Sequence, residues 1–348
     1  MKRRILCVLL VLAMGASLLA GCQKAKAPEP VQGTTFAMDT VMNITLYCEN
    51  TTSGQEVLTA LTGLLGRLDH ALSATGEDSD MSRVNRSGGR PVEVGGWTGE
   101  LLSRALALCE ATGGALDITA YPAVKAWGFT TEEHRIPPPG ELAELAANID
   151  YTAVQAEGNT VTLPAGVELD LGAAAKGYAG DLLAQKVREN GISSALLDLG
   201  QSTIAAVGGK TDGSPWRIGV QDPDGDGWFA VIELADMAMG TSGGYQRYFE
   251  QDGVTYWHIL DPETAAPARS GLTSVTVISP SALVCDGLST ALFVMGLETG
   301  AQFWRDHPEL HFEAVFVTED GSIYYTAGLA ESFSRAGGYE DREVTVLE

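Results

Sequence analysis

The clearest pattern along the chain is a set of apolar positions with helical spacing. Between Gln55 and Leu72 they recur every three or four residues, which predicts an amphipathic helix. Further helices are predicted over residues 99–111 and 141–147. Shorter alternating stretches predict strands over residues 36–47, 194–198, 202–207, 216–221, 228–234, 274–278, 312–317 and 323–326.

One stretch with many small residues joins a predicted strand to a predicted helix. Residues 170–181 read Asp-Leu-Gly-Ala-Ala-Ala-Lys-Gly-Tyr-Ala-Gly-Asp, after an alternating segment at Val167 and Leu169. Small side chains let a ligand lie against the backbone, a helix start offers free N–H groups, and Lys176 adds a positive charge. The stretch is therefore either a phosphate site or a close-packed turn with a solvated lysine, since short Gly/Ala-rich motifs do not separate the two.

The N-terminus has the pattern of a bacterial export signal. A basic start precedes an apolar run over residues 5–20 that is short for a membrane span. Leu-Ala-Gly before Cys22 resembles a lipobox, with an ordinary signal peptide and an incidental cysteine as the alternative. We expect a lipoprotein signal peptide at residues 1–21, a lipid-anchored tether at 22–32 and a folded domain at 33–348. Lipid on Cys22 would hold the protein on the extracytoplasmic side of the cell membrane.

Charge and cysteine content limit the partners and the site chemistry. The formal net charge is -23, and loss of Lys2, Arg3 and Arg4 would make it -26, which argues against a nucleic-acid partner. An anionic ligand would need a local cation, and this favours a metal. Beyond Cys22, an odd number of cysteines without Cys-x-x-Cys spacing predicts core thiols and no disulfide framework or zinc site. These cysteines are Cys48, Cys109 and Cys285.

The last third of the chain contains two patterns of oxygen ligands. Asp286 and Thr290 are four residues apart and share one face of a helix predicted to start near Ser279. Carboxylate and hydroxyl oxygens suit Mg²⁺, although a capping aspartate and a helical threonine explain the pair more simply. Residues 222–227 with Glu233 match the EF-hand loop pattern, but their predicted strand flanks favour a solvated acidic turn.

Five motifs, in order, resemble those of the ApbE family of FAD:protein FMN transferases. They lie between about residues 36 and 295, behind a lipobox that many family members share, at residues 113–119, 170–181, 242–248, 258–262 and 286–290. The resemblance implies an α+β (mixed α/β) fold, with a single tunnelling-fold-like domain and FAD in a cleft. It also implies an enzyme that splits FAD, releases AMP and joins the FMN phosphate to a threonine hydroxyl of another exported protein.

The resemblance also implies the site residues. For Mg²⁺ it implies the carbonyl of Ala173, the carboxylate of Asp286 and the hydroxyl of Thr290. The acceptor is expected to carry an Asp-Gly-x-Thr-Gly-Ala-Thr-like motif. Thr75-Gly76 replaces an aromatic residue of many members, and Ser289 replaces a second acid of some, which would weaken flavin stacking and metal affinity. The implied FAD contacts are Met38, Ala115, Leu116, Asp117, Asp170, Lys176 and Leu260.

The chemistry of such a site would be phosphoryl transfer, which needs charge neutralisation and in-line placement more than covalent help. Mg²⁺ on Asp286 and Thr290 would stabilise charge growing toward AMP. His258 is the candidate base for the threonine, since an imidazole of pKa ~6.5 accepts a proton at neutral pH; a histidine packed inside a strand is the alternative. A Mg²⁺-dependent FAD pyrophosphatase and a non-enzymatic flavin-binding lipoprotein are the competing functions.

Overall fold

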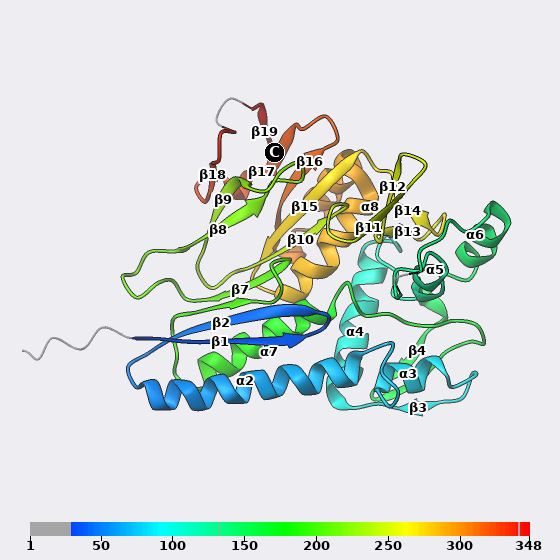
Figure 1. The fold of residues 1–348 in the computed structure, drawn as a ribbon, viewed down its shortest axis with the longest axis horizontal. Helices are drawn as coiled ribbons and strands as arrows, with labels where there is room; N and C mark the ends of the chain where they lie inside the picture. The colour runs from blue at the N-terminus through cyan, green and yellow to red at the C-terminus, as the bar shows by residue number, and fades with distance from the viewer. Residues whose placement is uncertain (1–28, 132, 340–341) are drawn as a thin grey trace, which may run out of the picture.

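The computed structural model describes residues 29–348, except residues 132 and 340–341. The predicted signal peptide, Cys22 and the predicted tether up to residue 28 lie outside the described residues. The described chain folds around a nine-stranded sheet (Figure 1), in which all neighbours are antiparallel except the last pair. In sheet order the strands are β1 (Glu29–Ala37), β2 (Thr40–Cys48), β6 (Ala195–Asp198), β7 (Thr203–Val207), β10 (Ala238–Gly243), β15 (Leu272–Ser279), β16 (Glu313–Thr318), β17 (Ile323–Thr326) and β19 (Val344–Leu347).

Helices cover one face of this sheet, and a small second sheet covers the other. The main hydrophobic core lies between the helices and the large sheet. A second core lies between the two sheets and includes Phe229 and Ile232. These layers confirm the predicted mixed fold. The covering elements are α2 (Thr51–Leu72), α4 (Gly96–Ala111), α7 (Ala175–Glu189), α8 (Ala282–Asp306), β8 (Trp216–Gln221), β9 (Trp228–Leu234) and β18 (Phe333–Arg335).

Shorter elements gather beyond one end of the large sheet, on the right in Figure 1. A third, small core there includes Trp127, Leu260 and Ala265. The described elements of this region are α3 (Asp80–Asn85), α5 (Tyr121–Ala126), α6 (Pro139–Ala146), β3 (Val92–Glu93), β4 (Gln155–Glu157), β5 (Thr160–Thr162), β11 (Tyr248–Gln251), β12 (Val254–Trp257), β13 (Leu260–Asp261) and β14 (Ala266–Pro267).

The predicted helices are present, with ends set by capping groups. α2 begins at Thr51, ahead of the predicted Gln55, because the side chain of Asn50 accepts the N–H groups of residues 52 and 53. Its Leu61, Leu65 and Leu68 are fully buried, and each contributes about 1.5–3 kcal/mol by leaving water. α4 covers the predicted range 99–111, and α6 covers the predicted range 141–147 up to its C-cap, residue 147.

The start of α8 lies later than predicted. Ser281 caps the helix by accepting the N–H of residue 284, so the helix begins at Ala282 and not near Ser279. Among the described residues, α8 is a helix long and apolar enough to cross a membrane. Its apolar side chains pack against β10 and β15 in the main core, so burial explains this composition.

Most predicted strands are also present, and the acidic turn at residues 222–227 joins β8 to β9. Glu233 lies within β9 opposite Arg217, as expected for a strand and not for an EF-hand. The glycine-containing residues 240–243 pair with β15 as part of β10. Cys48, Cys109 and Cys285 are free and buried, as predicted.

The first predicted strand and the tether boundary were wrong. Residues 36–47 do not form one strand, because Met38 and Asp39 have φ of 49° and 58° and turn the chain into the β1–β2 hairpin. Residues 29–32, predicted as tether, belong to β1. Val31 pairs with Leu46 and is only 7% exposed, so it contributes to the core.

No strand in the described part of the chain pairs with the segment that leads to residue 170. The side chain of Asn85 donates to the carbonyl of Leu169 (2.9 Å) and accepts its N–H (2.7 Å), as a neighbouring strand would. The N–H of Asp170 donates to the carbonyl of Ile118 (2.9 Å). These bonds hold the loop that leads into α7 without a sheet ladder.

Candidate active site

The stretch around Lys176 lies where α7 crosses the start of α8. A Cβ on Gly177 would overlap the carbonyl of Ala282, and a Cβ on Gly180 would lie 3.1 Å from the Ala282 methyl carbon. These two glycines therefore allow the helices to pack closely. Fewer N–H groups are free at the start of α7 than the sequence predicted. The N–H of Ala175 donates to the carbonyl of Leu171 (2.8 Å), and the N–H of Gly177 donates to a side chain of α8.

Each helix supplies an aspartate to the N-terminus of the other. Asp181 of α7 accepts the N–H of Ala282 (2.6 Å) and the hydroxyl of Ser281 (2.7 Å). Asp286 of α8 accepts the N–H of Gly177 (2.7 Å). Free N–H groups and the helix dipole favour negative charge at a helix start. Asp286 is thus a capping group, as one alternative proposed, but it caps α7 and not its own helix.

The carboxylate of Asp286 is deeply buried, with 7% of the residue exposed. Its second oxygen accepts the hydroxyl of Thr203 (2.6 Å). Burial raises the pKa of Asp286, while the charge of Lys176 and the two hydrogen bonds lower it. Lys176 is half-buried, and its Nζ donates to the hydroxyl of Ser202 (2.7 Å). A fixed cation and a fixed carboxylate therefore lie close together at the crossing.

Hydroxyl groups extend this cluster on the side of β10. The Oγ of Ser242 lies 2.9 Å from the Oγ of Ser289 and 3.1 Å from the Oγ1 of Thr290. With Asp286, they give a set of oxygen donors, the kind that Mg²⁺ prefers. Ala173 lies in the turn just before α7.

The residues of the cluster fit a magnesium ion that takes further oxygens from its substrate. No group of three or more His, Cys, Asp or Glu side chains that could hold a metal occurs among the described residues. Mg²⁺ is commonly held by one or two carboxylates together with substrate phosphates, so a single buried carboxylate beside hydroxyl groups is sufficient. Zinc, which prefers histidine and cysteine, does not fit this set.

His258 follows β12 and is half-buried, so it is not packed inside a strand. Its backbone N–H donates to the carbonyl of Arg247 (3.0 Å), and its ring Nδ1 lies 3.2 Å from the same oxygen. A proton on Nδ1 satisfies this carbonyl and leaves a lone pair on Nε2. Burial, with the positive charges of Arg247 and Lys176, lowers the pKa of His258 to about 4. The ring is therefore neutral at pH 7 and can accept a proton.

Asp170 is close enough to Arg247, the neighbour of His258, to be affected by its charge. Its carboxylate accepts the N–H of Gly172 (3.0 Å), and burial raises its pKa while the charge of Arg247 lowers it. Arg247 thus acts electrostatically on both Asp170 and His258, and Lys176 acts on both His258 and Asp286. The structure brings these predicted residues into one region.

Other predicted flavin contacts have visible structural roles. Leu116 is buried and packs against α8 at Gly287. Asp117 accepts N–H groups of residues 119 and 151 (2.8 and 2.9 Å) and so holds its own loop. The N–H of Met38 donates to the carboxylate of Asp69 (2.9 Å). Flavin contact by these residues stays a prediction, as it does for the half-buried Ala115 and for Leu260 of the third core.

Three polar residues of the site were not predicted from the sequence. Ser202 and Thr203 were interpreted only as the start of a strand, yet their side chains bind Lys176 and Asp286. Arg247 lay inside a noted motif but received no role. No local signal identifies these residues, because their partners are distant in the chain.

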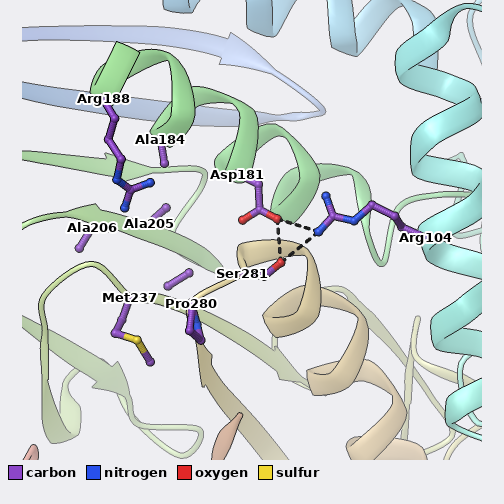
Figure 2. Close-up of a pocket in the computed structure, with 10 residues that line it drawn as sticks. Arg104, Asp181, Ala184, Arg188, Ala205, Ala206, Met237, Pro280 and Ser281 are labelled. Carbon is purple, nitrogen blue, oxygen red and sulfur yellow. Dashed lines mark hydrogen bonds and ion pairs between the residues drawn. The ribbon is translucent and has the colours of Figure 1, made fainter. Parts of the chain in front are cut away.

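A cavity of about 260 Å³ lies on the other side of the helix crossing. Figure 2 shows Asp181 joined there to Ser281 and to Arg104, whose guanidinium lies 3.3 Å from each. Arg188 at the far end bonds to Asp236 (2.9 Å). None of the ten lining residues is a predicted site residue, so this cavity belongs to the scaffold of the crossing.

The ApbE family model matches residues 38–316, and the chain belongs to this family. It is 34% identical over 324 residues to the FAD:protein FMN transferase of Vibrio cholerae, covering 91% of this chain and 96% of that protein. It is also 34% identical over 287 residues to the FAD:protein FMN transferase of Treponema pallidum, covering 77% of this chain and 78% of that protein.

Solved structures agree with this assignment. The ApbE protein of Thermotoga maritima has a TM-score of 0.80 and 34% identity, covering 86% of this chain and 98% of that one. The flavin transferase ApbE of Vibrio cholerae has a TM-score of 0.76 and 30% identity, covering 90% of this chain and 99% of that one. The predicted family and fold are confirmed, and the chain is an enzyme of the flavin transferase class.

Proposed function

We propose that this enzyme transfers the FMN part of FAD to a threonine hydroxyl of an exported protein and releases AMP, with Mg²⁺ as cofactor. The observation that carries the proposal is the convergence of Lys176, Asp286 and a neutral His258 in one region. The names of the relatives, FAD:protein FMN transferase, support FAD as substrate and a protein as acceptor.

Each residue of the site has a separate role in the proposed reaction. Mg²⁺ on Asp286, Thr290 and the carbonyl of Ala173 would neutralise pyrophosphate charge. Lys176 adds a second positive charge from the start of α7. Nε2 of His258 accepts the proton of the threonine hydroxyl as its oxygen forms a bond to the FMN phosphorus. The bond from that phosphorus to the bridging oxygen breaks, and AMP leaves with this oxygen and its electron pair.

The proposal is tested by incubating the mature enzyme with FAD, Mg²⁺ and an exported protein that carries an Asp-Gly-x-Thr-Gly-Ala-Thr-like motif. AMP is measured by chromatography and covalent FMN by mass spectrometry of the intact acceptor. We expect equal amounts of both products, and neither when EDTA is present. An acceptor whose motif threonine is replaced by valine serves as the control.

The two competing functions give different results in this assay. AMP without acceptor-bound flavin would favour the Mg²⁺-dependent pyrophosphatase. FAD that stays intact and bound would favour the flavin-binding lipoprotein. Transfer to the valine acceptor would contradict threonine as the site of attachment.

We also propose that lipid on Cys22 anchors the enzyme at the outer side of the cell membrane. The proposal rests on the lipobox pattern at residues 19–22. Cys22→Ala should move the protein from the membrane fraction to the soluble fraction and remove labelling by a palmitate analogue. A Cys22→Ala protein that stays labelled and membrane-bound would contradict it.

A further inference from the structure

Arg247 is an exposed cation beside the candidate base. The chain has 22 basic and 45 acidic residues, and several arginines form ion pairs, such as Arg188 with Asp236. Among the described residues, the guanidinium of Arg247 has neither a hydrogen bond nor an ion pair. A free guanidinium in so acidic a protein is available for an anionic ligand.

The backbone places Arg247 next to His258. Tyr248 and Trp257 are the first pair of the β11–β12 ladder, and just beyond it the backbone N–H of His258 donates to the carbonyl of Arg247 (3.0 Å). This hydrogen bond makes the two residues direct neighbours at the open end of the hairpin. The electrostatic effects of Arg247 on His258 and Asp170 agree with this placement.

The turn that carries Arg247 is held by close packing. The N–H of Gly244 donates to the carbonyl of Thr273 (3.2 Å), and a Cβ on Gly244 would lie 2.9 Å from the ring of Trp257. The side-chain amide of Gln246 donates to the carbonyl of Thr241 (3.3 Å). The backbone of residue 247 is therefore fixed, while its side chain reaches into solvent.

We infer that Arg247 contacts the phosphate of FMN during its transfer, from the side of the base. This inference rests on the proposed function. The transferred phosphorus carries charge on its non-bridging oxygens, and a guanidinium can bind two such oxygens at once. Lys176 is bound to Ser202 at the helix crossing, so Arg247 supplies the charge from the β11–β12 hairpin.

The substitution Arg247→Ala tests the inference with little disturbance of the base, because His258 bonds to the backbone carbonyl of residue 247 and not to its side chain. At pH 8 the imidazole is neutral with or without the neighbouring charge. Steady-state AMP release and acceptor flavinylation give kcat and the KM for FAD, and flavin fluorescence gives FAD affinity. The wild-type enzyme in the same assay tests the proposed function separately.

We expect Arg247→Ala to lower kcat by about 10²–10³-fold, as loss of a transition-state charge does, with less than a tenfold change in FAD affinity. Arg247→Lys should recover part of the rate, and added ethylguanidinium should partly rescue the alanine variant. Arg217→Ala, an exposed arginine on β8, is the control and should match wild type. An unchanged kcat, or a loss that neither lysine nor ethylguanidinium restores, would overturn the inference.

Discussion

Replacing Asp286 tests whether this residue is a metal ligand or only a helix cap. The structure shows the hydrogen bonds of the cap, so their contribution to the free energy of unfolding can be estimated. Its carboxylate accepts two buried donors, the N–H of Gly177 and the hydroxyl of Thr203. Asp286→Ala leaves both without this partner, at about 1–3 kcal/mol each, so we expect the free energy of unfolding to fall by about 2–6 kcal/mol. A loss of activity in Asp286→Ala could therefore result from unfolding and not from loss of the metal.

Asp286→Asn is the sharper substitution. The asparagine oxygen can accept the N–H of Gly177, and its amide can donate to the oxygen of Thr203. We expect a stability loss of only about 1 kcal/mol, the typical net value of one hydrogen bond. Magnesium prefers charged oxygen ligands, so Mg²⁺ affinity and AMP formation should both fall by orders of magnitude, about 10²-fold or more.

The matched control is Asp181→Asn, the reciprocal cap at the same crossing. Asp181 accepts donors at the start of α8 but is not a predicted ligand. The Asp181→Asn variant should lose a similar amount of stability and keep the Mg²⁺ dependence of the wild-type enzyme. Calorimetric Mg²⁺ titration, thermal unfolding and AMP release on each protein give the comparison. An Asp286→Asn enzyme with normal Mg²⁺ affinity and activity would refute the metal role and leave only the cap.

Three further predictions concern the neighbouring residues. Lys176→Ala should weaken FAD binding about tenfold, which corresponds to a loss of about 1.4 kcal/mol of binding free energy. Fluorescence titration measures this affinity, and the surface variant Lys186→Ala should bind FAD as the wild type does. His258→Gln should slow flavinylation by about 10²–10⁴-fold with FAD binding retained, and equal rates would exclude it as base. Because the pKa of folded His258, about 4, lies below the ordinary ~6.5, its contribution to stability is complete above pH ~6.5 and is lost as pH falls toward 4. The melting-temperature advantage of wild type over His258→Gln should shrink across that range, and a constant difference would contradict the lowered pKa.

The sequence predicted elements whose signal is local. The leucine spacing of α2 and the two strands around the acidic turn at residues 222–227 needed only neighbouring residues. The β1–β2 hairpin was missed because Met38-Asp39 is not a glycine-containing turn pair, although both residues adopt positive φ. The extended segment at Leu169 had a strand pattern, yet its partner is the side chain of Asn85.

The family resemblance implied candidate site residues one by one, and it did not imply the contacts between them. The family resemblance gave Lys176 and Asp286 as separate candidates, and the structure links them through a crossing of helices about a hundred residues apart. Gly177 and Gly180 have the i, i+3 spacing of a packing face, but nothing local tells which helix packs there. Thr203 could not be assigned at all, because a threonine at a strand start is common and its carboxylate partner is 83 residues away.

The glycine contact between α7 and α8 also bears on how this enzyme can be engineered. Residue 177 has no room for a methyl group, so the spacing between the cation and the buried carboxylate is set by two backbones in contact. Backbone contacts of this kind do not depend on side-chain rotamers or on the sequence of surface loops. We therefore expect that surface loops can be exchanged between relatives while the distance between Lys176 and Asp286 is kept, provided the two helix starts are transplanted as one unit.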